Sequence, residues 1–132
     1  NVYTKGPIRS SGTVASSAEY LSYHLAETPV LIFPCYRGTP GMLSPAQAGS
    51  IFPAAQNLML AALGLGLGTV ITTFHLHHEE KVKALLGIPD DVQTSCLIPM
   101  GYPAEGEHFG GSKRKPIEEL THYDRWGQMS PD

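Results

Sequence analysis

The fold is decided by the stretch Ser50-Ile-Phe-Pro-Ala-Ala-Gln-Asn-Leu-Met-Leu-Ala-Ala-Leu-Gly-Leu65. Its apolar residues recur at i, i+3, i+4, i+7, i+11 and i+14, the spacing of one helical stripe: Ile51, Ala54, Ala55, Leu58, Ala62 and Leu65. Ser50 can cap this helix, and Pro53 then falls in the first turn, where a missing N–H does little harm. Because the opposite side is apolar too, we expect the helix to be buried in the domain core or in a dimer interface.

Three glycines, Gly64, Gly66 and Gly68, follow this helix and precede the β-branched run 69–73, which predicts a strand. Their spacing is superficially that of a dinucleotide-binding loop. Such a loop lies between a strand and a following helix, so that the phosphate meets the helix N-terminus. Here the order is reversed, and we interpret the glycines as the end of the helix.

The remaining pattern predicts two more helices and two more strands. In chain order they are a helix over about 18–28 capped by Ser16 or Ser17, a strand over 30–33, a helix over about 78–86 closed by Gly87, and a strand over 96–98. The run 30–33 is continuous and apolar, which is typical of a central strand buried on both faces.

Length and composition bound the class of protein. The 132 residues suffice for one core, and 42% apolar with 16% charged residues is the composition of a folded domain. We expect one mixed α+β domain over residues 1–132. Its C-terminal arm, from about 117 to 132, carries Tyr123 and Trp126, which we expect to pack on a neighbour such as a partner subunit. A formal charge of −3 argues against nucleic acid and anionic membrane surfaces as partners.

The apolar runs and the cysteines of the sequence indicate the cellular compartment in which we expect the protein. No apolar run reaches the roughly 20 residues of a membrane-spanning helix, and no export signal opens the chain. Cys35 and Cys96 lie in apolar runs without a close-spaced ligand pattern, so we expect two buried free thiols. This use of cysteine fits a reducing cytoplasm.

The candidate catalytic and metal-binding residues are few. His75, His77 and His78 suggest a metal site, but zinc sites usually need wider spacing and ligands from a second segment. We therefore expect no metal and a solvent-exposed helix entry at these positions. Glu79 and Glu80 are expected to be solvated, and no nucleophile or acid–base pair stands out, so no side chain is predicted to be catalytic.

One basic cluster, Lys113-Arg114-Lys115, ends a glycine-rich loop just before Pro116. A guanidinium can clamp a phosphate with two parallel hydrogen bonds, and a nearby lysine adds a point charge. The cluster is too small for a nucleic-acid duplex but sufficient for a single phosphate. Taken alone, a solvated basic turn remains the alternative.

Four segments in order resemble the nitroreductase-like flavoproteins. They are the helix with its glycine turn (53–62 and 65–69), Leu85-Leu-Gly-Ile-Pro89, Met100-Gly-Tyr-Pro103, and Arg114-Lys-Pro-Ile-Glu-Glu-Leu120. The resemblance covers roughly residues 28–126. It implies an α+β homodimer with a mixed or antiparallel sheet flanked by helices, and FMN bound at each subunit interface.

The same resemblance implies an FMN-dependent oxidoreductase. In such an enzyme NAD(P)H reduces the flavin, and a nitroaromatic, a quinone or a similar small acceptor reoxidises it. Arg114 matches the family's phosphate-binding arginine, with Lys113 assisting, and Thr72 and Thr73 fall where the family's strand passes the isoalloxazine ring. The chemistry then belongs to the flavin, which agrees with the lack of a predicted catalytic side chain.

The chain also departs from the family's pattern. The family's N-terminal Arg-Ser-x-Arg segment, which grips FMN, has no match here, so we expect the N-terminal part to be missing. Two alternatives stay open: a related flavin-fold enzyme that dehalogenates or cleaves a flavin, and a non-catalytic homologue used for dimerisation or binding.

Overall fold

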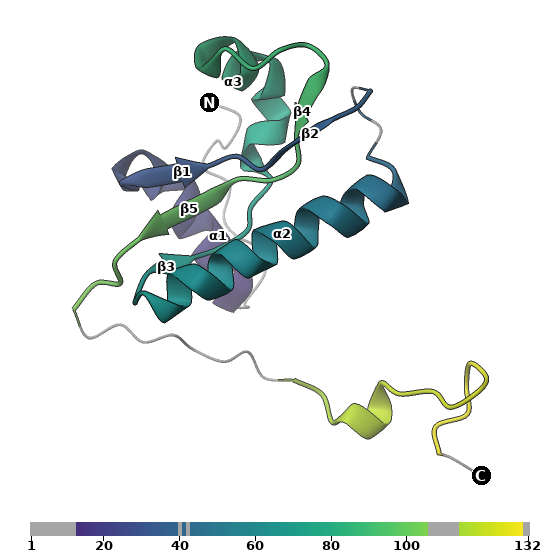
Figure 1. Ribbon diagram of the computed structural model, residues 1–132. Helices are drawn as coiled ribbons and strands as arrows, with labels where there is room; N and C mark the ends of the chain where they lie inside the picture. Colours follow the sequence, from purple (N-terminus) through teal and green to yellow (C-terminus); the bar gives the residue numbers. More distant parts are fainter. Residues whose placement is uncertain (1–12, 40, 42, 106–113, 131–132) are drawn as a thin grey trace.

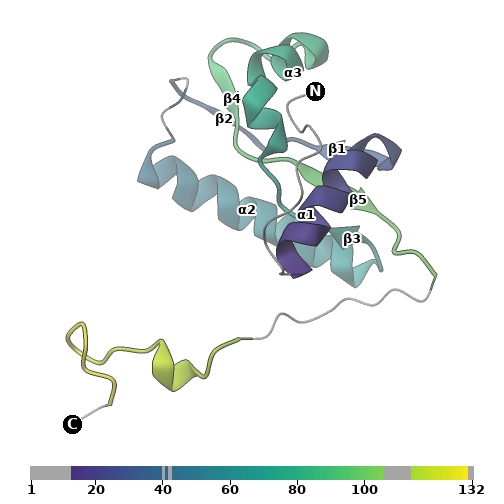
Figure 2. The same cartoon turned by 180° about the vertical axis from the view of Figure 1, so that it is seen from behind.

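The computed structural model describes residues 13–39, 41, 43–105 and 114–130. Its elements are α1 (Thr13–His24), η1 (Leu25–Glu27), β1 (Val30–Ile32), β2 (Cys35–Arg37), α2 (Pro45–Gly64), β3 (Gly68–Thr69), η2 (Phe74–His78), α3 (Glu79–Leu86), β4 (Val92–Thr94), β5 (Ile98–Gly101) and η3 (Ile117–Glu119), where η denotes a 3-10 helix. Figure 1 shows α2 across one side of the strands, and Figure 2 shows α1 on the other side. The predicted α+β class, with antiparallel strands flanked by helices, is confirmed.

The strands pair antiparallel in two groups, with the order β1-β5-β3 in one and β2-β4 in the other. Val30 pairs with Met100, and Cys35 pairs with Thr94. Val30 and Cys35 are five positions apart in the sequence, whereas their partners Met100 and Thr94 are six positions apart. The second segment therefore has one extra residue, within 95–97. This extra residue is a β-bulge between β4 and β5, and it divides a single long ribbon into two ladders.

The expectation of a central strand at 30–33 is wrong. Among the described residues β1 is an edge strand, and Val30 is 45% exposed, because β5 takes the central place between β1 and β3. The strand expected at 96–98 is misplaced, because most of that range belongs to the bulge and β5 begins only at Ile98. Of the strand expected at 69–73, only the start lies in β3, and Thr72 adds an isolated bridge to Leu97.

Helix α2 begins earlier than its apolar stripe predicts. Ser44, and not Ser50, is the N-cap: its hydroxyl accepts from the Gln47 N–H (3.2 Å), and the Gln47 carbonyl oxygen accepts from the Ser44 N–H (3.0 Å). In this reciprocal pair the Gln47 acceptor is the side-chain oxygen Oε1, so the arrangement is a capping box, with Pro45 at the first helical position. Pro53 therefore lies inside the helix and not in its first turn.

Helix α2 is only partly buried within the chain. Ala55 and Ala62 are buried, and Phe52, Leu58 and Met59 pack against the core cluster of Ala55, Cys96 and Ile98. The outer face stays open, with Leu60 55% exposed and Leu63 also exposed. The described residues therefore do not bury α2 on all sides. No helix in these ranges combines the length and apolarity needed to cross a membrane.

The predicted ends of α2 and α3 are confirmed, whereas the first helix, expected to reach about residue 28, ends as α1 at His24 and continues as η1 to Glu27. Leu65 and Leu67 donate to carbonyls of the last turn of α2, and Gly66 has φ +78°, a left-handed conformation that favours glycine. Gly87 ends α3 in the same way, with φ +66°. The start of α1 was predicted too late, because Ser16 and Ser17 lie within that helix.

The described C-terminal segment, residues 114–130, lies apart from the body in both views (Figures 1 and 2). Its one regular element is η3. The Trp126 ring stacks at a tilt on His122, with centroids 4.1 Å apart, yet Trp126 remains 91% exposed. The expected packing of this aromatic residue against a neighbour is not provided by the described part of the chain.

Candidate functional site

Thr72 and Thr73 follow β3 and lie beside the bulge. The Thr72 N–H donates to the Leu97 carbonyl (2.9 Å), and the Leu97 N–H donates to the Thr72 carbonyl (2.8 Å). Thr72 is buried by this bridge, whereas the next residue, Thr73, is exposed. Of the two predicted ring contacts, Thr72 already has its backbone groups paired within the protein, and Thr73 is the residue that faces outward.

A buried polar cluster follows directly in η2, and the sequence did not reveal it. His75 is 7% exposed, so the expectation of a solvent-exposed histidine is wrong at this position. Its Nε2 lies 3.0 Å from Oγ1 of Thr94, and the Phe33 ring meets the imidazole edge-on. The side chain is buried because η2 turns inward against β4, a contact between residues 19 positions apart that no local pattern encodes.

Glu79 completes the cluster from the first turn of α3. Its Oε1 accepts from the Thr94 N–H (2.8 Å) and from the Thr94 hydroxyl (2.6 Å), so the expectation that Glu79 is simply solvated is also wrong. A hydroxyl can donate only one hydrogen bond, and the Thr94 hydroxyl donates it to Glu79. Toward His75 the Thr94 oxygen can therefore only accept, so His75 Nε2 carries the proton of that hydrogen bond. We call His75, Thr94 and Glu79 the buried triad.

The triad fixes the tautomer of the neutral His75 ring, with the proton on Nε2. With Nε2 protonated, the neutral ring has its lone pair on Nδ1, which is buried and has no hydrogen-bond partner. Burial lowers the pKa of His75 below its ordinary value, while the nearby Glu79 carboxylate acts in the opposite direction. A neutral imidazole is thus the form that this site accommodates at neutral pH.

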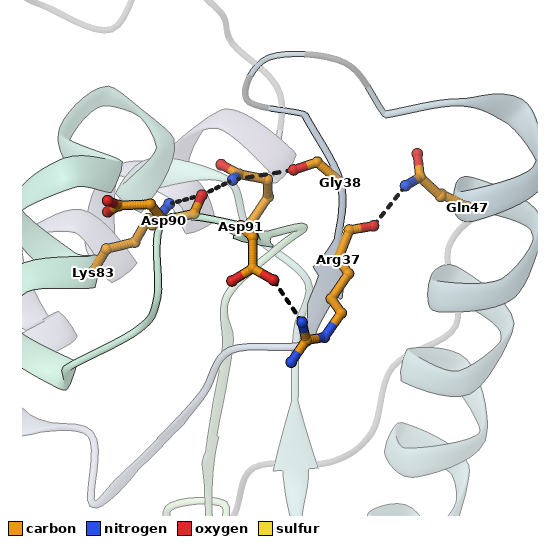
Figure 3. A network of polar contacts seen from close by, with 7 residues as sticks. Arg37, Gly38, Gln47, Lys83, Asp90 and Asp91 are labelled. Carbon is orange, nitrogen blue, oxygen red and sulfur yellow. Dashed lines mark hydrogen bonds and ion pairs between the residues drawn. The ribbon is translucent and has the colours of Figure 1, made fainter.

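A second polar network ties the β2–α2 connection to the turn before β4 (Figure 3). Arg37 Nη1 pairs with Asp91 Oδ2 (2.5 Å), and Gln47 Nε2 donates to the Arg37 carbonyl (2.8 Å). A β-carbon at Gly38 would come within 2.6 Å of that Gln47 amide, so the absence of a side chain allows this approach. The buried Gln93 donates to the Asp90 carbonyl (2.8 Å) from within the ribbon. These contacts are structural and close the end of the β2–β4 ladder that lies away from the bulge.

The predicted phosphate-binding residues lie elsewhere. Arg114 is exposed at the start of the C-terminal segment, and it makes no hydrogen bond or ion pair with the residues that the structure describes. Lys113 lies outside the described residues. In both views the segment that Arg114 begins lies apart from β3, the strand that Thr72 and Thr73 follow in the sequence.

An open cavity of about 460 Å³ lies on the α1 side of the three-stranded sheet. Thr69, Met100 and Tyr102 contribute to it from the sheet, with Tyr20 and His24 from α1. The rings of Tyr20 and His24 stack at 4.1 Å. Of the predicted cofactor residues that the structure describes, Thr72, Thr73 and Arg114, none lines this cavity.

The last groups to place are the potential metal ligands and the two cysteines. The described ranges contain no group of three His, Cys, Asp or Glu side chains placed to hold a metal ion. Both cysteines are free thiols, but only Cys96 is buried. The expectation that Cys35 is buried is wrong, because it lies on a three-residue strand of the two-stranded ladder with its side exposed; its thiol donates to the Phe33 carbonyl (3.1 Å).

The chain is similar to known proteins in both sequence and fold. Residues 4–102 match the family model of the Nitroreductase family. A provisionally named NADH dehydrogenase/NAD(P)H nitroreductase of Methanothermobacter thermautotrophicus is 36% identical over 75 residues, which are 55% of this chain and 38% of that protein.

Solved structures agree in fold. A protein of Bacteroides thetaiotaomicron with the same provisional name has a TM-score of 0.62 at 31% identity, covering 80% of this chain and 60% of that one. The FMN and NADPH-dependent nitroreductase NfnB of Sphingopyxis sp. strain HMH has a TM-score of 0.68 at 19% identity, covering 92% of this chain and 54% of that one; this likeness concerns the fold alone. The chain spans about two fifths of the length of the curated relatives that it matches, between 38% and 43%.

Proposed function

Because the chain belongs to the nitroreductase family, we propose that it is part of an FMN-dependent oxidoreductase. NAD(P)H is the electron donor, and a nitroaromatic, a quinone or a similar small molecule is the acceptor. The observation that carries the proposal is the family match over residues 4–102, which includes the exposed Thr73 beside its buried bridge. A cytoplasmic location is part of the same proposal.

The described residues fit a part of the cofactor. Arg114 is an exposed guanidinium with no carboxylate partner among the described residues, so it is free to clamp the FMN phosphate, with Lys113 adding charge. Thr73 is exposed, and because its carbonyl accepts from the Leu76 N–H (3.0 Å), its N–H, in the peptide bond to Thr72, is the backbone group left for the isoalloxazine ring. Thr72, whose backbone is paired with Leu97, holds that peptide in place and is the weaker candidate for direct contact.

The bound flavin would supply the electron transfer itself. The chain's own residues then bind the phosphate, orient the ring and keep water from it, and no side chain here needs to act as an acid or a base. This division of labour matches the described residues, because the buried imidazole of His75 is enclosed by the triad and not open to a substrate.

We further propose that the protein acts as a homodimer. The outer face of α2 exposes Leu60 and Leu63, and the C-terminal segment carries the exposed Trp126 away from the body. Apolar surface of this kind is typical of a protein–protein interface. A second subunit is also a reasonable source of groups that complete a site which the single chain leaves open.

The test is to measure FMN binding by the gene-encoded full-length protein, with the quenching of flavin fluorescence as the signal for binding. Losing a charged hydrogen-bonding group costs about 1.5–3 kcal/mol, so Arg114→Ala should weaken FMN binding by roughly ten- to a hundredfold. Arg125→Ala is the matched control, because Arg125 is an exposed arginine of the same segment. Unchanged affinity in Arg114→Ala would make the basic cluster a solvated turn and remove the residue-level basis of the proposal.

The reaction class needs a separate measurement. Under anaerobic conditions the FMN-loaded protein should oxidise NADH or NADPH when a nitroaromatic or a quinone is supplied. A protein that binds FMN but reduces neither acceptor would point to another reaction of the same fold. A protein that binds no FMN would point to a non-catalytic role.

A further inference from the structure

The bridge between Thr72 and Leu97 continues the pairing of β3 with β5. In the ladder itself Thr69 pairs with Met100. Three residues further along each strand Thr72 pairs with Leu97, so the register is unchanged. Between these two pairs the same register sets Pro99 opposite the segment that follows β3, and a proline has no N–H to donate to a ladder. The ladder therefore stops after Thr69 and is resumed at Thr72.

This bridge sets the direction of the peptide bond between Thr72 and Thr73. The Leu97 N–H donates to the Thr72 carbonyl (2.8 Å), so that carbonyl points toward β5. In a planar trans peptide the N–H of the next residue points the opposite way. The Thr73 N–H therefore points away from β5, toward the side of β3 that is the sheet edge among the described strands, and Thr73 is exposed there.

Leu97 is itself held in the core, because it closes the β-bulge of residues 95–97 and is only 1% exposed. At the other end of the bulge, Ser95 donates its N–H and its hydroxyl to the Pro34 carbonyl, both at 2.9 Å. Cys96, between them, is fully buried and belongs to the core cluster. Bulges are frequent beside active sites, where they change the direction of nearby groups. This bulge connects the core to the exposed Thr73 N–H.

We infer that Leu97 is a positioning residue of the cofactor site, which acts through its backbone N–H to aim the Thr73 N–H at the flavin ring. The inference rests on the proposed function, since it takes the Thr73 N–H as the group that bonds to the ring. Leu97 is too deeply buried to touch the cofactor itself. Its contribution is to hold the donor in its binding direction before the cofactor arrives, which reduces the cost of ordering on binding.

The direct test removes the Leu97 N–H and keeps the side chain, by an amide-to-ester change at Leu97 in the FMN-loaded full-length protein. One backbone hydrogen bond that orients the donor is lost, so we expect roughly two- to tenfold weaker FMN binding. A donor aimed at the ring favours the electron-rich reduced flavin, so the flavin reduction potential should also become more negative. The FMN dissociation constant, the visible flavin spectrum and the reduction potential are measured on the same preparations.

An amide-to-ester change at Ile88 is the matched control, because the Ile88 N–H donates to the Lys83 carbonyl (2.9 Å) in the turn after α3. It should lower stability to a similar extent and leave FMN affinity and potential unchanged. Thr73→Pro removes the donor itself, so adding the Leu97 ester to this variant should change FMN affinity by less than about twofold. Equal losses of affinity in the Leu97 and Ile88 esters, or full additivity with Thr73→Pro, would overturn the inference.

Amide hydrogen exchange of the wild-type protein decides the question if a variant does not fold. The Leu97 amide should exchange slowly with and without FMN, whereas the Thr73 amide should exchange fast without FMN and slow down when FMN binds. Fast exchange at Leu97, or no slowing at Thr73 on binding, would overturn the positioning role and leave the oxidoreductase proposal intact. Wild-type protein that binds no FMN would overturn both.

Discussion

Replacing Thr94 by valine tests the buried triad through stability alone. Valine keeps the β-branched shape and removes the hydroxyl, which accepts from His75 at 3.0 Å and donates to Glu79 at 2.6 Å. The backbone N–H of residue 94 can still donate to Glu79, as it does now at 2.8 Å. The substitution thus deletes two hydrogen bonds without opening a large cavity.

The expected loss follows from what each partner keeps. The His75 Nε2–H would be left buried without an acceptor, at a cost of about 1–3 kcal/mol. Glu79 is only half-buried and retains the backbone bond, so its share should be at the low end of the 1.5–3 kcal/mol typical of charged groups. Together we expect the free energy of unfolding to fall by about 2–4 kcal/mol, because water can replace part of the Glu79 bond.

The assay is urea unfolding followed by circular dichroism near neutral pH. The slope of free energy against urea should stay the same, while the midpoint falls. Thr73→Val is the matched control, because Thr73 is exposed, and it should change the free energy of unfolding by less than about 0.5 kcal/mol. A loss below about 0.5 kcal/mol in Thr94→Val, with an unchanged slope, would refute the reasoning that the hydroxyl links His75 to Glu79.

Four further outcomes are expected. Because burial lowers the pKa of His75, the unfolded chain takes up a proton before the folded one, so wild-type stability should fall as pH drops below about 6.5; urea unfolding at two pH values should show a smaller fall in His75→Gln. Gly87→Ala should lower stability in thermal unfolding by about 1–2 kcal/mol, since φ +66° strains a residue with a β-carbon although the space around it is open. Leu60→Glu should shift the proposed dimer toward monomer in sedimentation, whereas Leu85→Glu, on the exposed side of α3, should not. Arg37→Ala should cost less than about 1 kcal/mol in urea unfolding, because its ion pair with Asp91 is largely solvent-exposed.

Local sequence signals predicted the helices better than the strands. The apolar stripe and Gly66 marked the body and end of α2, because both signals lie within a few residues of the structure they specify. The start was missed although the Ser44 to Gln47 capping box is visible in the sequence. Pro53 supplied a competing signal, and the apolar stripe begins only after the first turn.

The strands were missed where pairing across the chain decides the structure. β2 and β4 have three residues each, too few for a period to be read, and they exist because each pairs with a segment more than 50 positions away. The edge position of β1 likewise depends on where β5 lies. No pattern within residues 30–33 distinguishes an edge strand from a central one.

The assignment of the cofactor residues depends on family resemblance and stays a prediction. Thr73 carries no local sign of cofactor binding, whereas the basic cluster around Arg114 suggested a phosphate site, with a solvated turn as the alternative. His75 could not be found in this way, because the three neighbouring histidines look alike in sequence. What distinguishes His75 is a hydroxyl on a strand that the chain reaches 19 residues later.

The ribbon also sets the order in which the chain can fold. Its pairs join Arg37 to Val92 and Val30 to Met100, which are 55 and 70 positions apart. Closing loops of this length costs roughly 4 kcal/mol of chain entropy before any strand contact repays it, so α2 and α3 can form well before the ribbon. During synthesis, at about 5–20 residues per second, the apolar strand β1 must wait several seconds for β5 to emerge. Throughout that interval its backbone edge is open to chaperones and to other nascent chains.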